Sequence, residues 1–214
     1  MAIVGATGAG KSTIINLVNR FYEIQEGRIS VDDINIKDYF LPSLRNEIAV
    51  VLQDVFLFSD SVYNNIVLNN TDIPLSEVVD AAKLIGIHDF IMSLPGGYDY
   101  NVRERGVMLS SGQRQLISFL RAYISKPSIL ILDEATSSID SYSEQLIQKA
   151  TETITKNQTS IIIAHRMTTV KNADRIIVMD RGEIMEMGSH KELLEHDGFY
   201  KNLYDMQFAS SEMI

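Results

Sequence analysis

The sequence predicts an α/β fold built on a mostly parallel sheet, and three observations lead to this class. Short apolar runs with the length of buried strands alternate with segments whose apolar residues recur at helical spacing. A glycine-rich loop connects the first of these strands to the first helix, as at the start of an α/β unit. Between residues 55 and 125 strand-like runs vanish, which indicates a helical insertion.

Five apolar runs have the length of buried strands. Because a strand that is apolar along its whole length must be covered on both faces, such runs separated by helices predict a parallel sheet. A further segment, "RISVDDINI", alternates around an Asp-Asp turn and predicts a small antiparallel hairpin over Arg28–Ile36. The five strands are expected at Ala2–Val4, Ile48–Leu52, Ile129–Leu132, Ser160–Ala164 and Arg175–Met179.

Helical spacing predicts a first helix from Ile14 to Phe21 and two helices in the insertion, over Leu75–Ile85 and Ile87–Leu94. The chain shows no internal repeat and no low-complexity segment, so we expect one domain over 1–214. Its core is expected to comprise 1–54 and 126–214, and its helical subdomain 55–125.

Two later helices are expected to begin with a capping box. In this motif a serine and a glutamate three residues further on each accept a hydrogen bond from the other residue's backbone N–H. The pairs that match it are Ser141 with Glu144 and Ser189 with Glu192.

Composition excludes several classes of function. The net charge of -9 and the sequence pI of about 4.9 argue against binding to nucleic acid, which requires clustered Lys and Arg. The absence of cysteine excludes disulfides and thiolate metal sites, and the four histidines are too scattered to suggest a metal centre. No apolar run reaches the roughly 20 residues of a membrane-spanning helix. We therefore expect a soluble, intracellular domain.

The strongest motif is "GATGAGKST", which fits the pattern G-x-x-x-x-G-K-[ST] between the first strand and the first helix. Glycines let the backbone wrap closely around a phosphate and direct its N–H groups inward. Lys11 is expected to reach the β- and γ-phosphates of a nucleotide, and the Ser12 hydroxyl to bind Mg²⁺. The predicted phosphate-binding loop consists of Gly5, Ala6, Thr7, Gly8, Ala9, Gly10, Lys11, Ser12 and Thr13.

A pair of carboxylates ends the apolar run in "ILILDEATSS". A carboxylate at the end of a strand beside a phosphate-binding loop lies where the nucleotide's Mg²⁺ needs a ligand, and this role suits Asp133. Glu134 is placed to orient and deprotonate a water molecule that attacks the γ-phosphate. An isolated Asp-Glu pair would more often begin a loop, but the phosphate-binding loop in the same chain favours the chemical roles.

Two further strands end in polar residues. Gln53 either joins the shell of Mg²⁺ or of water, or bridges to the helical region, and on its own it is better explained as structural. His165 either contacts a γ-phosphate or is a structural histidine, and the residues alone leave the two readings balanced. Both are expected at the sheet edge where Gly5 and Asp133 also lie, which is where open α/β sheets bind ligands.

The stretch "LSSGQRQ" predicts a second anion-binding helix start, because a short glycine-containing turn runs into helical spacing. With this stretch, six motifs in register resemble those of ATP-binding cassette (ABC) ATPases over essentially the whole chain. The motifs are Gly5–Thr13 as Walker A, Gln53 as Q-loop, Leu109–Gln113 as signature, Ile129–Glu134 as Walker B, Ser137-Ser138-Ile139-Asp140 as D-loop and His165 as switch histidine.

The resemblance implies a P-loop NTPase (RecA-like) core, a small antiparallel β part and an inserted α-helical subdomain. It is closest to exporter-type half-transporters, because the stretch "VRERG" at Val102–Gly106 resembles their X-loop. It implies ATP and Mg²⁺ as cofactors, with Gly8 to Thr13 at the phosphates, Ser12, Gln53 and Asp133 at the metal, Glu134 as general base and His165 as γ-phosphate sensor.

The resemblance also implies partners. Ser110, Ser111, Gly112 and Gln113, with Asp140, would serve ATP bound to a second nucleotide-binding domain placed head to tail; Ser111 stands where the family commonly has glycine. A transmembrane domain would be contacted through the Q-loop and X-loop region, at the cytoplasmic side of the cell membrane. The resemblance thus implies the ATP-hydrolysing motor domain of an exporter. It implies no nucleic acid as a partner.

Two other functions stay open. One is a non-transport ABC ATPase of DNA repair or translation, against which the acidic charge and the exporter-like X-loop argue. The other is a nucleotide-binding module with little hydrolysis. Family members usually carry about two more strands and an adenine-stacking aromatic residue before the P-loop. Because only four residues precede Gly5, we expect an N-terminal truncation that leaves the antiparallel part incomplete.

Overall fold

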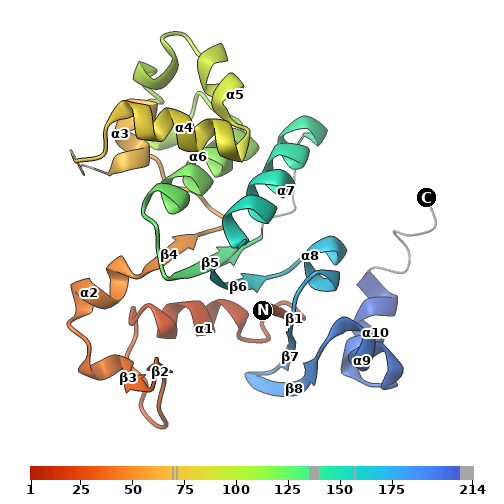
Figure 1. The fold of residues 1–214 in the computed structure, drawn as a ribbon. Helices are drawn as coiled ribbons and strands as arrows, with labels where there is room; N and C mark the ends of the chain where they lie inside the picture. Colours follow the sequence, from red (N-terminus) through yellow and green to blue (C-terminus); the bar gives the residue numbers. More distant parts are fainter. Residues whose placement is uncertain (69, 71, 135–139, 157, 208–214) are drawn as a thin grey trace. The chain divides into compact units, whose positions relative to one another are not determined.

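The computed structural model of the chain describes residues 1–68, 70, 72–134, 140–156 and 158–207. Its α/β architecture consists of a six-stranded sheet with the strand order β4-β5-β6-β1-β7-β8, a separate two-stranded sheet and helices (Figure 1). Contacts divide the chain into two compact units. Unit 1 comprises residues 1–45, 131–134 and the described part of 160–214, and unit 2 comprises 46–130 and the described part of 135–159.

Unit 1 is organised around β1, the strand that precedes the glycine-rich loop. It pairs in parallel with β6 on one side and with β7 on the other, and β8 pairs antiparallel with β7. Ile3, Ala9 and Met179 form a buried apolar cluster beneath the loop. The elements are β1 (Ala2–Gly5), α1 (Lys11–Val18), β2 (Ser30–Val31), β3 (Ile34–Asn35), α2 (Leu41–Asn46), β6 (Thr159–Ile163), α8 (Met167–Lys171), β7 (Ile176–Asp180), β8 (Glu183–Gly188), α9 (His190–Glu195) and α10 (Phe199–Gln207).

The predicted hairpin is present as β2 and β3, in which Val31 pairs with Ile34. Asp32 and Asp33 form its two-residue turn and both have a positive φ, of 47° and 64°. Aspartate tolerates this conformation better than most residues, and two positive φ values match the twist of the flanking strands. Arg20 ties the end of α1 to the segment after the hairpin, because its guanidinium donates to the Ile36 carbonyl oxygen at 2.9 Å.

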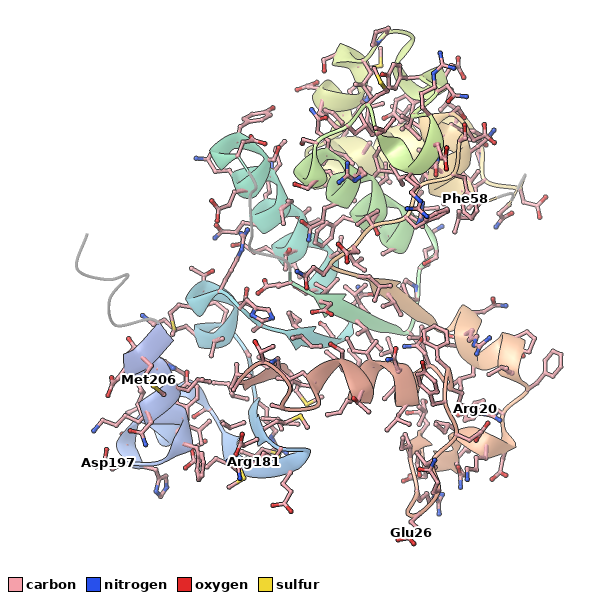
Figure 2. All side chains as sticks on the ribbon, turned by 180° about the vertical axis from the view of Figure 1, so that it is seen from behind. Arg20, Glu26, Phe58, Arg181, Asp197 and Met206 are labelled. Atoms are coloured by element: carbon pink, nitrogen blue, oxygen red, sulfur yellow. The ribbon has the colours of Figure 1, made fainter. Side chains whose placement is uncertain are left out.

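One strand, β8, is missing from the sequence prediction. It follows β7 through the two-residue turn Arg181-Gly182, whose φ values are 47° and 83° (Figure 2, with Arg181 labelled). At the far end of β8, Glu186 accepts hydrogen bonds from the backbone N–H groups of Phe199 and Tyr200 at 2.9 Å each. The strand thus provides the acceptors that the first turn of α10 needs.

Unit 2 carries the helices of the insertion. Figure 1 shows α3, α4, α5 and α6 gathered together, and α6 packs against α3, α4 and α7. No strand is assigned between β4 and β5 among the residues that the structure describes there. The elements are β4 (Ile48–Val51), α3 (Val62–Val67), α4 (Leu75–Ile85), α5 (His88–Ser93), α6 (Ser111–Ile124), β5 (Ile129–Asp133), which continues into unit 1, and α7 (Ser141–Thr155); short 3₁₀ turns lie at Ile36–Asp38, Gly97–Asp99 and Glu104–Gly106.

The predicted fold class is confirmed, since the larger sheet is mostly parallel and the hairpin supplies a small antiparallel part. The subdomain boundaries at 54/55 and 125/126 stay a prediction. In the described ranges, no helix is long and apolar enough to cross a membrane.

The capping boxes have different outcomes. The box of Ser189 and Glu192 is present at the start of α9. The box predicted for Ser141 and Glu144 is wrong, because α7 is capped one residue earlier: the Asp140 carboxylate accepts the Ser143 backbone N–H at 2.9 Å. A carboxylate that reaches the third helical N–H is itself a strong cap, so the helix begins after Asp140.

Candidate functional site

Three strands of unit 1 end beside one another. The Ala164 backbone N–H donates to the Ile3 carbonyl oxygen at 3.1 Å, and the Glu134 N–H donates to the Ile163 carbonyl oxygen at 3.2 Å. The end of β6 therefore lies between the ends of β1 and β5. The glycine-rich loop, the two carboxylates and His165 each follow one of these three ends, so the structure brings these predicted residues to one edge of the sheet, as expected.

The backbone of the loop has the conformation that a phosphate site requires. Gly8 and Gly10 have φ values of 83° and 101°, which side chains with a Cβ rarely adopt. Gly10 is the N-cap of α1, and no side chain caps this helix start. The first N–H groups of α1 are therefore available to an anion, toward which the helix dipole also points.

Lys11 lies inside this loop. Its side chain is buried, and its ammonium donates to the carbonyl oxygens of Gly5 and Ala6 at 2.8 Å and 2.9 Å. Burial lowers the pKa of Lys11, while the nearby Asp133 carboxylate acts in the opposite direction. The loop thus holds a fixed positive charge among backbone dipoles.

Asp133, at the end of β5, is close enough to interact with Lys11 and His165. Burial raises the pKa of its carboxyl, and the charges of His165 and Lys11 lower it. The hydroxyl of Ser12, in the first turn of α1, belongs to an exposed residue. Carboxylate and hydroxyl oxygens are the ligands that Mg²⁺ prefers, so this donor set fits the ion. No cluster of three or more His, Cys, Asp or Glu suited to a metal was found in the described ranges, and a hydrated Mg²⁺ does not need one.

The Glu134 carboxylate is held at both oxygens. Oε1 accepts a hydrogen bond from the Thr169 hydroxyl at 2.6 Å, and Oε2 accepts the backbone N–H groups of His165 and Arg166 at 3.2 Å and 3.4 Å. Thr169 is a residue that the sequence analysis missed. It lies four residues after the predicted sensor His165, in "AHRMTT", and that proximity is the signal that points to it.

The signature stretch lies in unit 2 at the start of α6. Ser110 is the N-cap, and its hydroxyl accepts the Gln113 backbone N–H at 3.2 Å. The Gln113 side chain in turn accepts the Ser110 N–H at 3.0 Å, which completes a capping box. The two side chains thus satisfy the backbone N–H groups of Ser110 and Gln113 at the helix start that the sequence predicts to bind an anion.

Two other predicted site residues of unit 2, Gln53 and Asp140, are exposed. Gln53 follows β4, and Asp140 caps α7. The backbone N–H and hydroxyl of Ser143 lower the pKa of Asp140. The remaining residues of the predicted D-loop, Ser137, Ser138 and Ile139, lie outside the described residues. Within unit 2, Val102 anchors the predicted X-loop as a fully buried side chain.

Comparison with known proteins agrees with this arrangement. Residues 1–137 match the family model described as ABC transporter. The chain is 50% identical, over 207 residues, to multidrug export ATP-binding/permease proteins of Staphylococcus aureus strains NCTC 8325 and COL, an alignment that covers 97% of this chain and 36% of each relative. It also resembles the solved structure of a bacterial Atm1-family ABC exporter with ATP bound, with a TM-score of 0.89 and 43% identity over 97% of this chain and 36% of that chain.

The fold and the site together define an α/β protein of the P-loop class. Within that class the comparisons are specific, and the chain belongs to the ABC transporter family. It is the ATPase domain of that family, as the motifs predict. The chain spans 36% of the length of the relatives and of the exporter that it matches.

Proposed function

We propose that the chain is the ATP-hydrolysing motor domain of an exporter-type ABC transporter. The observation that carries this proposal is the placement of two opposite charges after β1 and β5, the two strands whose ends flank the end of β6 in one unit. The Lys11 ammonium is fixed inside the phosphate-binding loop, and the Glu134 carboxylate is fixed by three donors beside His165. Phosphoryl transfer needs a cation at the phosphates and a base for the attacking water, and both are supplied here.

In the proposed binding step, the phosphates of ATP lie on the backbone N–H groups of Gly8 to Thr13. Lys11 exchanges a loop carbonyl for the β- and γ-phosphate oxygens and keeps its charge in place. Ser12 and Asp133, with Gln53, would hold Mg²⁺, which when bound neutralises charge on the phosphate oxygens. Because the loop already has its positive-φ glycines in position, binding costs little reorganisation.

In the proposed hydrolysis step, Glu134 accepts a proton from the attacking water. The water oxygen bonds to the γ-phosphorus while the bond from that phosphorus to the β–γ bridging oxygen breaks, which leaves ADP and phosphate. His165 contacts a γ-phosphate oxygen and stabilises the charge that develops there.

The proposed working unit is a head-to-tail dimer. One ATP has a single γ-phosphate, and the P-loop of the same chain already binds it. The start of α6 would therefore serve the ATP of a second nucleotide-binding domain, through Ser110, Ser111, Gly112 and Gln113, with Asp140 beside them. Dimer closure on ATP and reopening after hydrolysis would then drive export.

The proposed second partner is a transmembrane domain, contacted by the Gln53 region and by Val102–Gly106. This partner would place the chain at the cytoplasmic side of the cell membrane. The relatives are named as ATP-binding/permease proteins and are longer than this chain, which supports such a partner. The division into a core of 1–54 and 126–214 and a helical subdomain of 55–125 is part of the same proposal.

The experiment that tests the base is Glu134→Gln. We expect phosphate release to fall by at least about 100-fold, because general-base catalysis contributes 10² to 10⁴ in rate. ATP binding should be retained, since the amide keeps the shape of the carboxylate. Glu183→Gln, which alters an exposed glutamate on β8 of the same unit, serves as the control and should turn over normally. If Glu134→Gln releases phosphate at the parent rate, the assignment of the base is wrong.

A further inference from the structure

We infer that Thr169 is a positioning residue for the base: its hydroxyl fixes one oxygen of the Glu134 carboxylate, while the backbone of His165 and Arg166 fixes the other. This inference rests on the proposed function, because it assigns Thr169 a role through Glu134. Thr169 is 35 residues away from Glu134 in the sequence, on another element.

The three hydrogen bonds are unequal. The hydroxyl of Thr169 lies 2.6 Å from Oε1, which is within the range of charge-assisted O–H···O⁻ bonds. The two backbone N–H groups lie 3.2 Å and 3.4 Å from Oε2, toward or beyond the long end of the N–H···O range. Thr169 therefore makes the tightest of the three contacts, and its loss should loosen the carboxylate most.

The arrangement leaves the base able to act. A carboxylate oxygen has about two lone-pair sites, and Oε1 uses one of them for Thr169. The second lone-pair site of Oε1 remains to accept a proton from water while the hydrogen bond from Thr169 stays in place. Oε2 receives two donors, so it is the oxygen less able to take a third.

The donors are themselves well fixed. Two are backbone groups directly after β6, and the third is on the first turn of α8. A helical threonine has two main χ1 rotamers, and the hydrogen bond to Oε1 of Glu134 selects one of them. A base whose orientation is set before substrate binds needs less rearrangement in the transition state.

The test compares three variants at neighbouring positions. Thr169→Val keeps the shape and removes the donor, Thr169→Ser keeps the donor, and Thr168→Val alters the adjacent, exposed threonine as a control. We expect Thr169→Val to lower kcat for ATP hydrolysis at least tenfold while KM for ATP stays within about twofold. Thr169→Ser should recover most of kcat, and Thr168→Val should leave it unchanged.

A double mutant separates positioning from folding. If Thr169 acts through Glu134, adding Thr169→Val to Glu134→Gln should cause no further loss of rate, because the two changes affect one step. Thermal unfolding and binding of a fluorescent ATP analogue are measured on each variant. A Thr169→Val protein whose kcat loss is matched by an equal rise in KM, or is not restored by serine, would contradict positioning.

Failure of this inference can be distinguished from failure of the proposed base. If Thr169→Val hydrolyses ATP like the parent while Glu134→Gln is inactive, Glu134 remains the base and the role of Thr169 is wrong. If Glu134→Gln is as active as the parent, the proposed base is wrong and the role of Thr169 falls with it.

Discussion

The ammonium of Lys11 is held in the glycine-rich loop by backbone carbonyl oxygens. An ammonium taken out of water needs hydrogen-bond acceptors, and here the carbonyl oxygens of Gly5 and Ala6 provide them. Two acceptors leave one of its three N–H donors for a further partner. The buried lysine is thus a part of the loop, and in the proposed binding step it is also a ligand of the phosphates.

This leads to a prediction for Lys11→Ala. Hydrogen bonds to charged groups contribute about 1.5–3 kcal/mol, so the affinity for ATP should fall by at least about tenfold. Binding of a fluorescent ATP analogue measures the change. Lys201→Ala removes a partly exposed lysine of the same unit, one paired with Asp197 at 3.0 Å, and should bind as the parent does. Equal affinities of the parent and Lys11→Ala would exclude Lys11 from the phosphate site.

At this scale the sequence identifies residues that belong to local patterns and misses those that act over distance. Gly5 to Thr13 is a contiguous motif, and the carboxylates directly follow a strand, so both were predictable. Thr169 was not, because its relation to Glu134 exists only after β5 and β6 pair. The capping box of Ser110 and Gln113 follows the local pattern S-x-x-Q, but the glycine-containing turn favoured the interpretation as an anion-binding helix start.

Among the elements, the turn at Arg103 stores backbone strain. Its φ of 62° and ψ of -176° lie in a region that glycine occupies almost exclusively, at a cost of about 1–3 kcal/mol for other residues. Two backbone N–H groups hold the turn: that of Val102 donates to the Asp60 carbonyl oxygen at 3.0 Å, and that of Arg103 donates to the Asn101 side chain at 2.8 Å. Such strain is typical of active sites, ligand clamps and switch regions, and this segment is the predicted X-loop.

We predict that Arg103→Gly stabilises the chain. Relief of the strain should exceed the extra entropy of an unfolded glycine, for a net gain of about 1 kcal/mol in the free energy of unfolding. Urea denaturation measures it. Arg105→Gly is the matched control, because Arg105 has an ordinary left-handed conformation with φ 53° and ψ 19°, and a smaller gain is expected there. A loss of stability in Arg103→Gly would show that no strain is stored.

Strands and helices that carry a strong apolar period were predictable, and elements set by turns were less so. The structure reproduces α4 over Leu75–Ile85 at the expected bounds. It adds β8, whose Glu183–Gly188 segment is mostly exposed and lacks the apolar run of a buried strand. What makes it a strand is the tight Arg181-Gly182 turn, which returns the chain along β7.

For the whole molecule, the central expectation is that two copies or two related domains work together. In the proposed mechanism, the start of α6 is a second anion site in a chain whose P-loop binds the phosphates of its own ATP. The starts of α1 and α6 can both bind a γ-phosphate only if each serves a different ATP. Two chains placed head to tail would allow this.

Ser110→Arg tests this expectation. The long cation should fill the space between the start of α6 and the neighbouring phosphates, so ATP-driven dimerisation should disappear while the monomer still binds ATP. Size-exclusion chromatography with ATP, in the Glu134→Gln background to slow hydrolysis, measures the dimer. Ser189→Ala controls for the loss of a capping box, since it opens the equivalent box of α9 and should dimerise normally. Monomers of Ser110→Arg that no longer bind ATP would be evidence against the dimer interpretation.

The anchoring of Glu134 also turns two peptide groups into a probe of the base. The amide protons of His165 and Arg166 have the Oε2 atom of this carboxylate as their acceptor. An amide proton exchanges with deuterium only when its hydrogen bond opens. The exchange rates at these two positions therefore record how often the carboxylate swings away from its anchors, and they do so without any turnover of substrate.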